Sequence, residues 1–142
     1  MHWQNKSLQL RHLDAGSCNG CEQELTALTS QAYDISQFGI DLVASPRHAD
    51  ALVVTGPVTD TMIKPLQKVW EAIPRPKRLV ALGDCAAGCG VFQKAYACHG
   101  GVASAFGSPD LVIRGCPPQP TEMLEQLKRF QNNSQTATES GL

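Results

Sequence analysis

The chain has 142 residues, of which 42% are hydrophobic and 18% are charged, and its formal net charge is −1. This length suits one domain with one core, and the charge excludes the basic face that nucleic-acid binding requires. No apolar run could span a bilayer and no signal peptide is recognisable, so we expect a cytoplasmic protein whose six cysteines serve metal or redox chemistry rather than disulfides.

Short apolar runs separated by Gly and Pro alternate with helical patterns along most of the chain. We predict strands at 7–13, 39–45, 49–56, 77–83 and 109–115, and helices at 21–33, 59–73 and 120–130. Strands that alternate with helices favour an α/β three-layer sandwich with a mostly parallel sheet. Residues 1–130 are predicted to form this domain, and the polar residues 131–142 a disordered tail.

All three predicted helices carry an apolar face, which in the last helix consists of Met123, Leu124 and Leu127. Leu25 and Leu28 share one side of the first helix, and the second has Thr59 as its expected N-cap and Pro65 in an irregular first turn or at a kink. The apolar residues of the second helix recur at helical spacing: Met62, Ile63, Leu66, Val69, Trp70 and Ile73.

Four cysteines come directly after predicted strands. Cys18 and Cys21 follow the first strand, Cys85 follows the fourth and Cys116 follows the fifth. Because the carboxyl ends of parallel strands lie at one edge of a sheet, these thiols should converge there. Four convergent thiolates suit a 4Fe–4S cluster or a tetrahedral zinc ion. A 2Fe–2S cluster remains an alternative, although no ferredoxin spacing is present.

Two cysteines remain outside this pattern. Cys89 is four residues after Cys85 and could reach the same site, although a small residue filling a tight loop is the simpler interpretation. Cys98 precedes His99 without any further ligand pattern, so we interpret it as incidental.

Four motifs together resemble one protein family: "GSCNGCE", "VVTGPVT", "GDCAAGCG" and "RGCPPQP", in that order. They are similar to the small electron-transfer subunit shared by energy-converting membrane-bound nickel–iron hydrogenases and respiratory complex I, and the resemblance covers about residues 8–130. It implies a flavodoxin-like fold without flavin that holds one 4Fe–4S cluster at the carboxyl ends of the strands. The ligands that the resemblance implies are Cys18, Cys21, Cys85 and Cys116.

The resemblance also implies a role and partners. The protein would pass electrons between the clusters of a ferredoxin-like polyferredoxin subunit and the nickel–iron site of a large catalytic subunit, without catalysis of its own. Membrane-embedded subunits would be indirect partners, and the complex would lie on the cytoplasmic face of the inner membrane. Glu22 is a candidate for a proton path or for tuning of the cluster. The alternative is that it is only an acid in the first turn of a helix, where the helix dipole favours a negative charge. The expected partner interface is Thr55, Gly56, Pro57, Val58 and Thr59.

Two alternatives stay open at this point. One is the corresponding small subunit of a complex I-like NADH:quinone oxidoreductase, which passes electrons to quinone, although complex I subunits have adjacent cysteines where this chain has Cys18-x-x-Cys21. The other, from a different class, is a structural zinc docking module with the same four cysteines. The chain departs from the family pattern at Cys89, which replaces a glycine and leaves open whether Cys85 or Cys89 is the ligand.

Overall fold

The fold was analysed in a computed structural model of the 142-residue chain. The structure describes residues 7–16, 20–56, 58–74, 77–87, 102, 109–115 and 118–140, without the side chains of residues 85, 87 and 132–140. Among these residues, no helix combines the length and the apolar character needed to cross a membrane.

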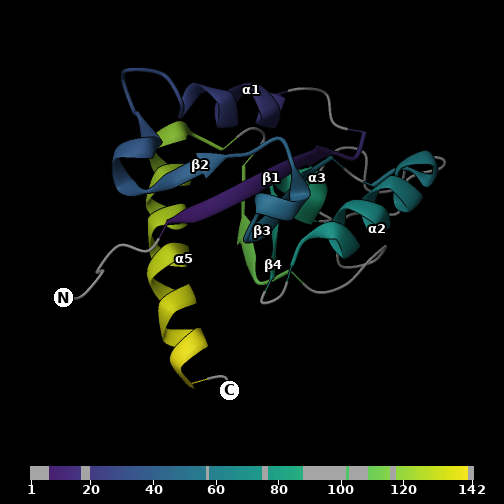
Figure 1. Ribbon diagram of the computed structural model, residues 1–142. Helices are drawn as coiled ribbons and strands as arrows, with labels where there is room; N and C mark the ends of the chain where they lie inside the picture. The colour runs from purple at the N-terminus through teal and green to yellow at the C-terminus, as the bar shows by residue number, and fades with distance from the viewer. Residues whose placement is uncertain are drawn as a thin grey trace.

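Five parallel strands form one sheet in the order β2-β1-β3-β4-β5 (Figure 1). Their bounds are Leu8–Asp14 for β1, Ile40–Leu42 for β2, Ala51–Thr55 for β3, Arg78–Leu82 for β4 and Leu111–Ile113 for β5. In the register of the central pairs, Asp14 lies opposite Thr55, and Thr55 lies opposite Leu82. This strand order is that of doubly wound flavodoxin-like folds, in which ligands bind at the carboxyl ends of the strands. The predicted α/β fold class is therefore confirmed.

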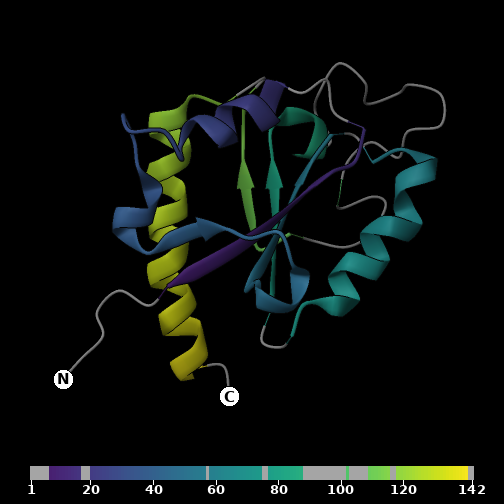
Figure 2. The same ribbon diagram turned by 45° about the horizontal axis from the view of Figure 1, so that its top comes forward.

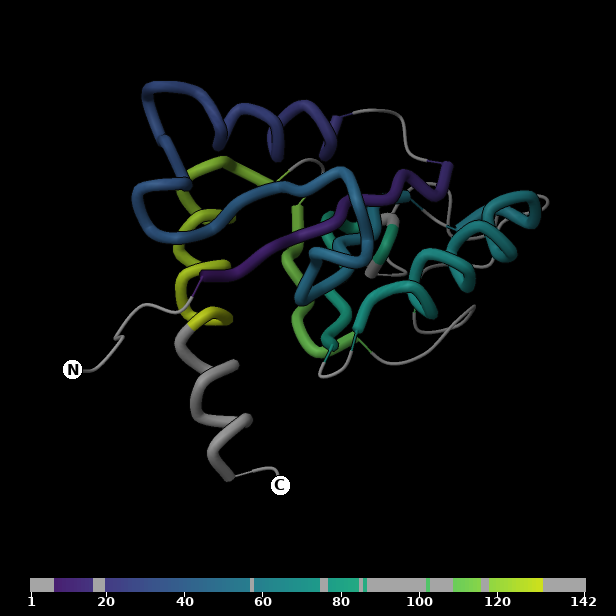
Figure 3. The backbone as a smooth tube through the Cα atoms, viewed as in Figure 1, coloured from purple at the N-terminus to yellow at the C-terminus, as the bar shows by residue number. Residues whose placement is uncertain are grey.

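Helices cover both faces of the sheet. On one face α1 (Gly20–Ala27) and α5 (Pro120–Ser140) pack against alternate strand residues, and α2 (Ile63–Ala72) with α3 (Asp84–Ala87) covers the other. In Figure 2 the arrows of β4 and β5 point toward the edge where α3 and the first turn of α1 lie, and Figure 3 shows the backbone of β1 passing between α1 and α2. Of the predicted inward residues, those fully buried in these two cores are Leu25, Leu28, Leu66, Ile73, Met123 and Leu127. Those partly buried against the cores are Met62, Ile63, Val69, Trp70 and Leu124.

The predicted second helix begins as a single turn of 3₁₀-helix, η3 (Asp60–Met62), and continues as α2. Thr59 occupies the N-cap position in an extended conformation, but its side chain makes no capping hydrogen bond. Pro65 lies in the first turn of α2, where its missing N–H removes no intrahelical bond. This arrangement explains how a proline fits inside the predicted helix.

The first helix is shorter than predicted: it ends at Ala27, whereas the prediction extended to residue 33. The hydroxyl of Thr29 donates to the carbonyl of Thr26 and that of Ser30 to the carbonyl of Ala27, both at 2.7 Å. Such local side-chain bonds offer the backbone an alternative to the helix. The chain then reaches β2 through a 3₁₀-turn, η1 (Ile35–Phe38), and a second one, η2 (Pro46–His48), precedes β3.

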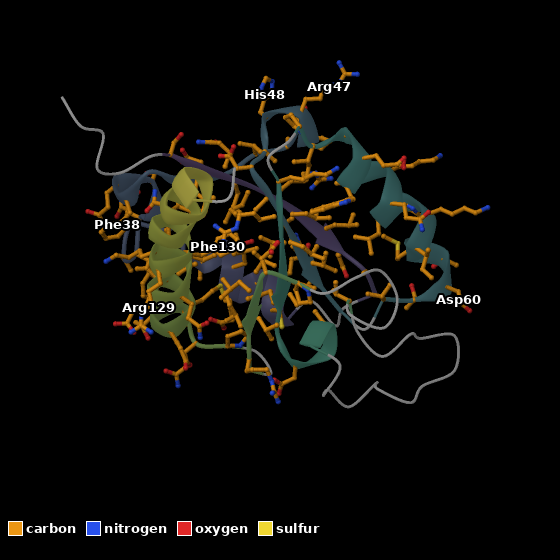
Figure 4. All side chains as sticks on the ribbon, turned by 90° about the horizontal axis from the view of Figure 1, so that it is seen from below. Phe38, Arg47, His48, Asp60, Arg129 and Phe130 are labelled. Atoms are coloured by element: carbon orange, nitrogen blue, oxygen red, sulfur yellow. The ribbon has the colours of Figure 1, made fainter. Side chains whose placement is uncertain are left out.

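Helix α5 extends beyond its predicted end at residue 130. The guanidinium of Arg78 stacks on the ring of Phe130 at 3.6 Å from the centroid. Buried Gln131 donates from Nε2 to the carbonyl of Phe38 at 3.0 Å. Figure 4 shows Phe130 on this helix and Phe38 next to it, with Arg47 and His48 projecting at a different side of the molecule from Asp60. The domain boundary at residue 130 and the polar tail stay predictions.

Candidate metal centre

The segment that carries Cys85 is hydrogen-bonded to the segment that leads into Cys116. The amide of Gly83 donates to the carbonyl of Ile113 at 2.6 Å, and the amide of Asp84 donates to the carbonyl of Gly115 at 2.8 Å. These bonds continue the pairing of β4 with β5 beyond the last paired residues, Leu82 and Ile113. The chain therefore reaches both cysteine positions from one rigid edge of the sheet.

The thiol of Cys21 lies against the same segment. A Cβ atom built on Gly83 would lie 2.4 Å from Sγ of Cys21 and 3.6 Å from the carbonyl oxygen of Gly115. Gly83 has φ +92°, a conformation that favours glycine. Three chain segments, from α1, β4 and β5, thus meet at Gly83, and a side chain there would displace the sulfur.

Asp84 forms the main polar link at this edge. Its Oδ1 accepts hydrogen bonds from the amide of Gly115 and from Nε of Arg114, each at 2.9 Å. These bonds lower the pKa of Asp84, with the Arg114 bond as the largest cause and the Gly115 amide as the next. The carboxylate is therefore ionised at neutral pH, next in sequence to Cys85.

The loop after β1 is packed against the loop after β3. The amide of Ala15 donates to the carbonyl of Thr55 at 2.7 Å, and the amide of Thr59 donates to the carbonyl of Ala15 at 3.2 Å. Gly16, at φ +98°, is so close that an added Cβ would lie 2.5 Å from Cγ2 of Thr59. The backbone that leads to Cys18 is thereby held on the β3 loop.

The β3 loop itself is largely internal to the chain. Thr55, Gly56 and Val58 are buried, whereas Thr59 is half-buried. Val58 has φ +61°, which is strained for a β-branched residue, and its fully buried side chain offsets that strain. Of the described residues predicted to contact a partner, Thr59 retains the most accessible surface.

A second polar group lies under the first turn of α1. Nε2 of His12 is 2.9 Å from Oγ1 of Thr55, and Nδ1 of His12 is 4.0 Å from Oε1 of Glu22. The carboxyl of Glu22 also hydrogen-bonds the carboxyl of Asp14, whose Oδ1 accepts from the amide of Gly16 at 3.0 Å. Four polar side chains therefore form a continuous chain from β3 to the helix that carries Cys21.

The pKa values of Glu22 and His12 are shifted in directions that favour their neutral forms. Burial, the largest cause, raises the pKa of Glu22, and the charge and hydrogen bond of Asp14 raise it further. Burial lowers the pKa of His12 despite the opposing charge of Asp14. A helix N-terminus alone would lower the pKa of a first-turn acid, so at Glu22 the effects of burial and of Asp14 are larger.

The structure places the predicted site residues unevenly. Cys21 and Glu22 lie in α1, and the backbone of Cys85 lies in α3. Cys18, Pro57, Cys89, Cys98 and Cys116 lie outside the described residues, as does the side chain of Cys85. Within the described part of the chain no group of three metal-binding side chains occurs, so the four-cysteine ligand set stays a prediction.

The sequence interpretation missed His12, Asp14, Asp84 and Arg114. The alternation of Leu8, Leu10, His12 and Asp14 on one face of the first strand could have shown that two polar side chains continue an apolar stripe toward the carboxyl edge. For Asp84 and Arg114 the only signal is that each lies within two residues of a predicted ligand.

The fold and the described part of the site define a class: a flavodoxin-like α/β domain in which Cys21, Gly83 and Gly115 meet at the carboxyl edge of the sheet. The family model described as "NADH ubiquinone oxidoreductase, 20 Kd subunit" matches residues 18–130, so the chain belongs to this family. The resemblance found in the four motifs is confirmed.

Several known proteins are similar to this chain. The probable membrane-bound hydrogenase subunit mbhJ of Pyrococcus furiosus is 41% identical over 80% of this chain and 67% of its own length. Formate hydrogenlyase subunit 7 of Escherichia coli is 40% identical over 84% of this chain, which spans only 46% of that protein. A chain in the structure of the membrane-bound sulfane sulfur reductase, an archaeal respiratory membrane complex, has 30% identity and a TM-score of 0.75, with coverage of 92% of this chain and 73% of that chain.

Proposed function

We propose that this chain is an electron-transfer subunit that holds one 4Fe–4S cluster on Cys18, Cys21, Cys85 and Cys116. The observation that carries the proposal is that Sγ of Cys21 meets Gly83 and Gly115 at one edge of the sheet. Gly83 lies two residues before Cys85, and Gly115 lies directly before Cys116. Similarity to hydrogenase and respiratory-complex subunits supports it.

The residues of this edge fit an iron–sulfur cluster. Cysteine thiolates are the usual ligands of such clusters, and Cys21 is half-buried against the glycine that adjoins the Asp84–Cys85 segment. The cluster would supply a one-electron carrier whose potential depends on burial and on hydrogen bonds to sulfur. The chain itself would hold the ligands, exclude water with its α1 and α5 core, and present the site at its carboxyl edge.

The proposed partners lie on the two sides of an electron path. A ferredoxin-like polyferredoxin subunit would supply electrons, and a large subunit with a nickel–iron site would receive them, in a hydrogenase like those named for the relatives. The surface for the large subunit would include Thr59 and Pro57 beside the first cysteine loop, since Thr55, Gly56 and Val58 are buried in this chain and would support it from beneath. The complex would lie on the cytoplasmic face of the inner membrane, held there by membrane-embedded subunits.

Glu22 is the proposed proton-handling or tuning residue of the site. Its raised pKa, its hydrogen bond to Asp14 and its 4.0 Å separation from His12 support a role in holding a proton near Cys21. A carboxyl whose pKa is raised keeps its proton to a higher pH than an ordinary glutamate, so it can donate and regain a proton more readily.

The experiment that tests the proposal is metal analysis of the anaerobically purified complex and of four Cys→Ser variants. Relative to the wild-type complex, whose partner subunits hold further iron, serine at Cys18, Cys21, Cys85 or Cys116 should remove about four iron atoms per copy of this chain, because a serine oxygen is a poor substitute for a soft thiolate. Cys98→Ser is the matched control and should keep the iron. Zinc in place of iron would support the docking-module alternative and contradict the proposal.

A quinone-linked role is the second candidate, favoured by the description of the family model. The two candidates differ in the large subunit that co-purifies with this chain. Nickel in that partner and hydrogen evolution by the complex would support the hydrogenase role. Quinone reduction without nickel would support the other.

A further inference from the structure

Asp84 ties the two halves of the candidate site together through a closed ring of hydrogen bonds. Its amide donates to the carbonyl of Gly115 at 2.8 Å, and the amide of Gly115 donates back to Oδ1 of Asp84 at 2.9 Å. Asp84 precedes Cys85 and Gly115 precedes Cys116. The ring therefore joins the two residues from which the chain continues directly into the predicted ligands.

The same ring occurs twice more in the described part of the chain, at the opposite edge of the sheet. Asp110 and Leu79 exchange the two bonds at 2.7 and 2.8 Å, and Asp50 and Gln9 exchange them at 2.7 and 2.9 Å. These two rings join neighbouring strands at their amino ends, opposite the edge where Cys21 and the backbone of Cys85 lie. A ring of this kind is thus a device for fixing adjacent strand ends, and the ring of Asp84 fixes the pair of ends at the site.

The Asp84 ring also carries an ion pair. Arg114 donates from Nε to Oδ1 of Asp84 at 2.9 Å, so an ion pair lies beside the predicted ligands. The side chain of Arg114 is 60% exposed and that of Asp84 is 25% exposed. An exposed pair of this kind contributes little to stability. Its two charges nevertheless lie close to the place where an electron would be added.

We propose that Asp84 is a positioning residue: it locks the Cys85 and Cys116 segments together before metal binds, and its pair with Arg114 balances the charge beside the metal centre. This inference rests on the proposed function for its electrochemical part, whereas the locking of the two segments concerns the chain alone. Residues that orient metal ligands contribute about 10–100-fold to metal retention.

The test compares Asp84→Ala with Asp110→Ala in the purified complex. Asp110→Ala is the matched control, because it breaks the same kind of ring between the same two strands at their other end. Under a chelator, Asp84→Ala should lose iron at least about tenfold faster than wild type, whereas Asp110→Ala should not. In the metal-free chain, a short thiol-to-thiol cross-linker should join Cys85 to Cys116, and Asp84→Ala should reduce this product while Asp110→Ala leaves it unchanged.

Two further variants test the charge. Asp84→Asn keeps an oxygen that can accept both bonds but removes the negative charge, so the midpoint potential should become more positive. Arg114→Gln leaves the ring and exposes the negative charge of Asp84, so the potential should become more negative. If Asp84 and Arg114 had only a structural role, these two variants would not shift the midpoint potential in opposite directions.

The outcomes separate the inference from the proposed function. A wild-type complex without iron would contradict the proposed function, and the cross-linking result would still decide whether Asp84 locks the segments. An iron-containing wild type whose Asp84→Ala variant retains iron and cross-links like Asp110→Ala would overturn the locking role. Potentials that do not separate in opposite directions would overturn the charge-balancing role.

Discussion

Sγ of Cys21 occupies the space in which a side chain at Gly83 would begin, since a Cβ there would lie 2.4 Å from the sulfur. Gly83→Ala should therefore displace Cys21 and also force alanine into a backbone conformation with φ +92°. We expect loss of about 1–2 kcal/mol of folding stability from the backbone conformation, together with loss or severe disturbance of the iron–sulfur signal. Iron content and electron paramagnetic resonance of the reduced complex measure the second effect.

The control for this variant is Gly39→Ala. Gly39 also has positive φ, at +80°, but lies where the chain enters β2 at the amino edge of the sheet. Its replacement should cost a similar amount of stability and leave the iron signal intact. An intact signal in Gly83→Ala would show that Cys21 is not held by this contact.

His12 predicts a pH dependence of stability. Burial lowers its pKa below the ordinary value of 6.5, so the folded chain favours neutral imidazole. The resulting stabilisation is present above the ordinary pKa and is lost as the pH falls through the lowered pKa. His12→Gln keeps a polar group near Thr55 but cannot titrate, so its stability should change less than that of wild type between about pH 7 and pH 5. Denaturant unfolding of the chain at several pH values measures the difference.

The opposing groups near His12 make this prediction specific. The negative charge of Asp14 raises the pKa of His12, and Arg11 lowers it. His48 is the control, because it lies exposed in η2, whereas His12 is half-buried beside Thr55 and Glu22. His48→Gln should leave the pH profile unchanged, and a profile altered equally by both substitutions would contradict the assignment to His12.

Much of the fold could be predicted from the sequence, because burial produces a regular pattern. The run Ala51–Thr55 is apolar along most of its length and is buried on both faces, as expected for a central parallel strand. Leu66 and Ile73 likewise indicated the inward face of α2. The predicted end of the first helix was wrong. The helical sequence pattern continues past Ala27, but in the structure the hydroxyls of Thr29 and Ser30 bond to nearby carbonyls.

The candidate site could be predicted only in part. The position of Cys21 and Cys85 shortly after predicted strands was enough to predict that their segments lie at one edge, because the carboxyl ends of parallel strands lie together. The role of Asp84 could not be predicted, because its partner Gly115 is 31 positions away and the bond depends on the register of β4 with β5. The burial of Val58 was missed for the same reason: it arises from packing of the β1 loop on the β3 loop.

Cys89 provides a test of which cysteine binds iron. If Cys89 only fills space in its loop, Cys89→Gly should keep the full iron content and visible absorption, since glycine tolerates backbone conformations that other residues resist. Cys85→Ser should lose both. The reverse pattern, with iron lost in Cys89→Gly and kept in Cys85→Ser, would reassign the ligand.

Glu22→Gln tests the polar chain that joins Thr55, His12, Glu22 and Asp14. Because the folded chain raises the pKa of Glu22, this residue favours stability at low pH and loses that contribution as the pH rises through the raised pKa. Above the raised pKa the charged Glu22 opposes Asp14, so in that pH range the neutral glutamine should leave the chain at least as stable as wild type. If Glu22 were only a helix-end acid, Glu22→Gln would instead lower the free energy of unfolding by about 0.3–1 kcal/mol.

The same substitution separates proton handling from structure in the assembled complex. Glutamine keeps the shape and can still hydrogen-bond Asp14, but it cannot give up and regain a proton at this position. If Glu22 carries protons, hydrogen evolution should fall about tenfold, which is about 1.4 kcal/mol in the barrier, while the iron signal stays intact. Glu24→Gln, two residues further along α1, should leave turnover unchanged. Wild-type turnover in Glu22→Gln would exclude this residue from the proton path and leave its charge, measured by the midpoint potential, as the remaining role.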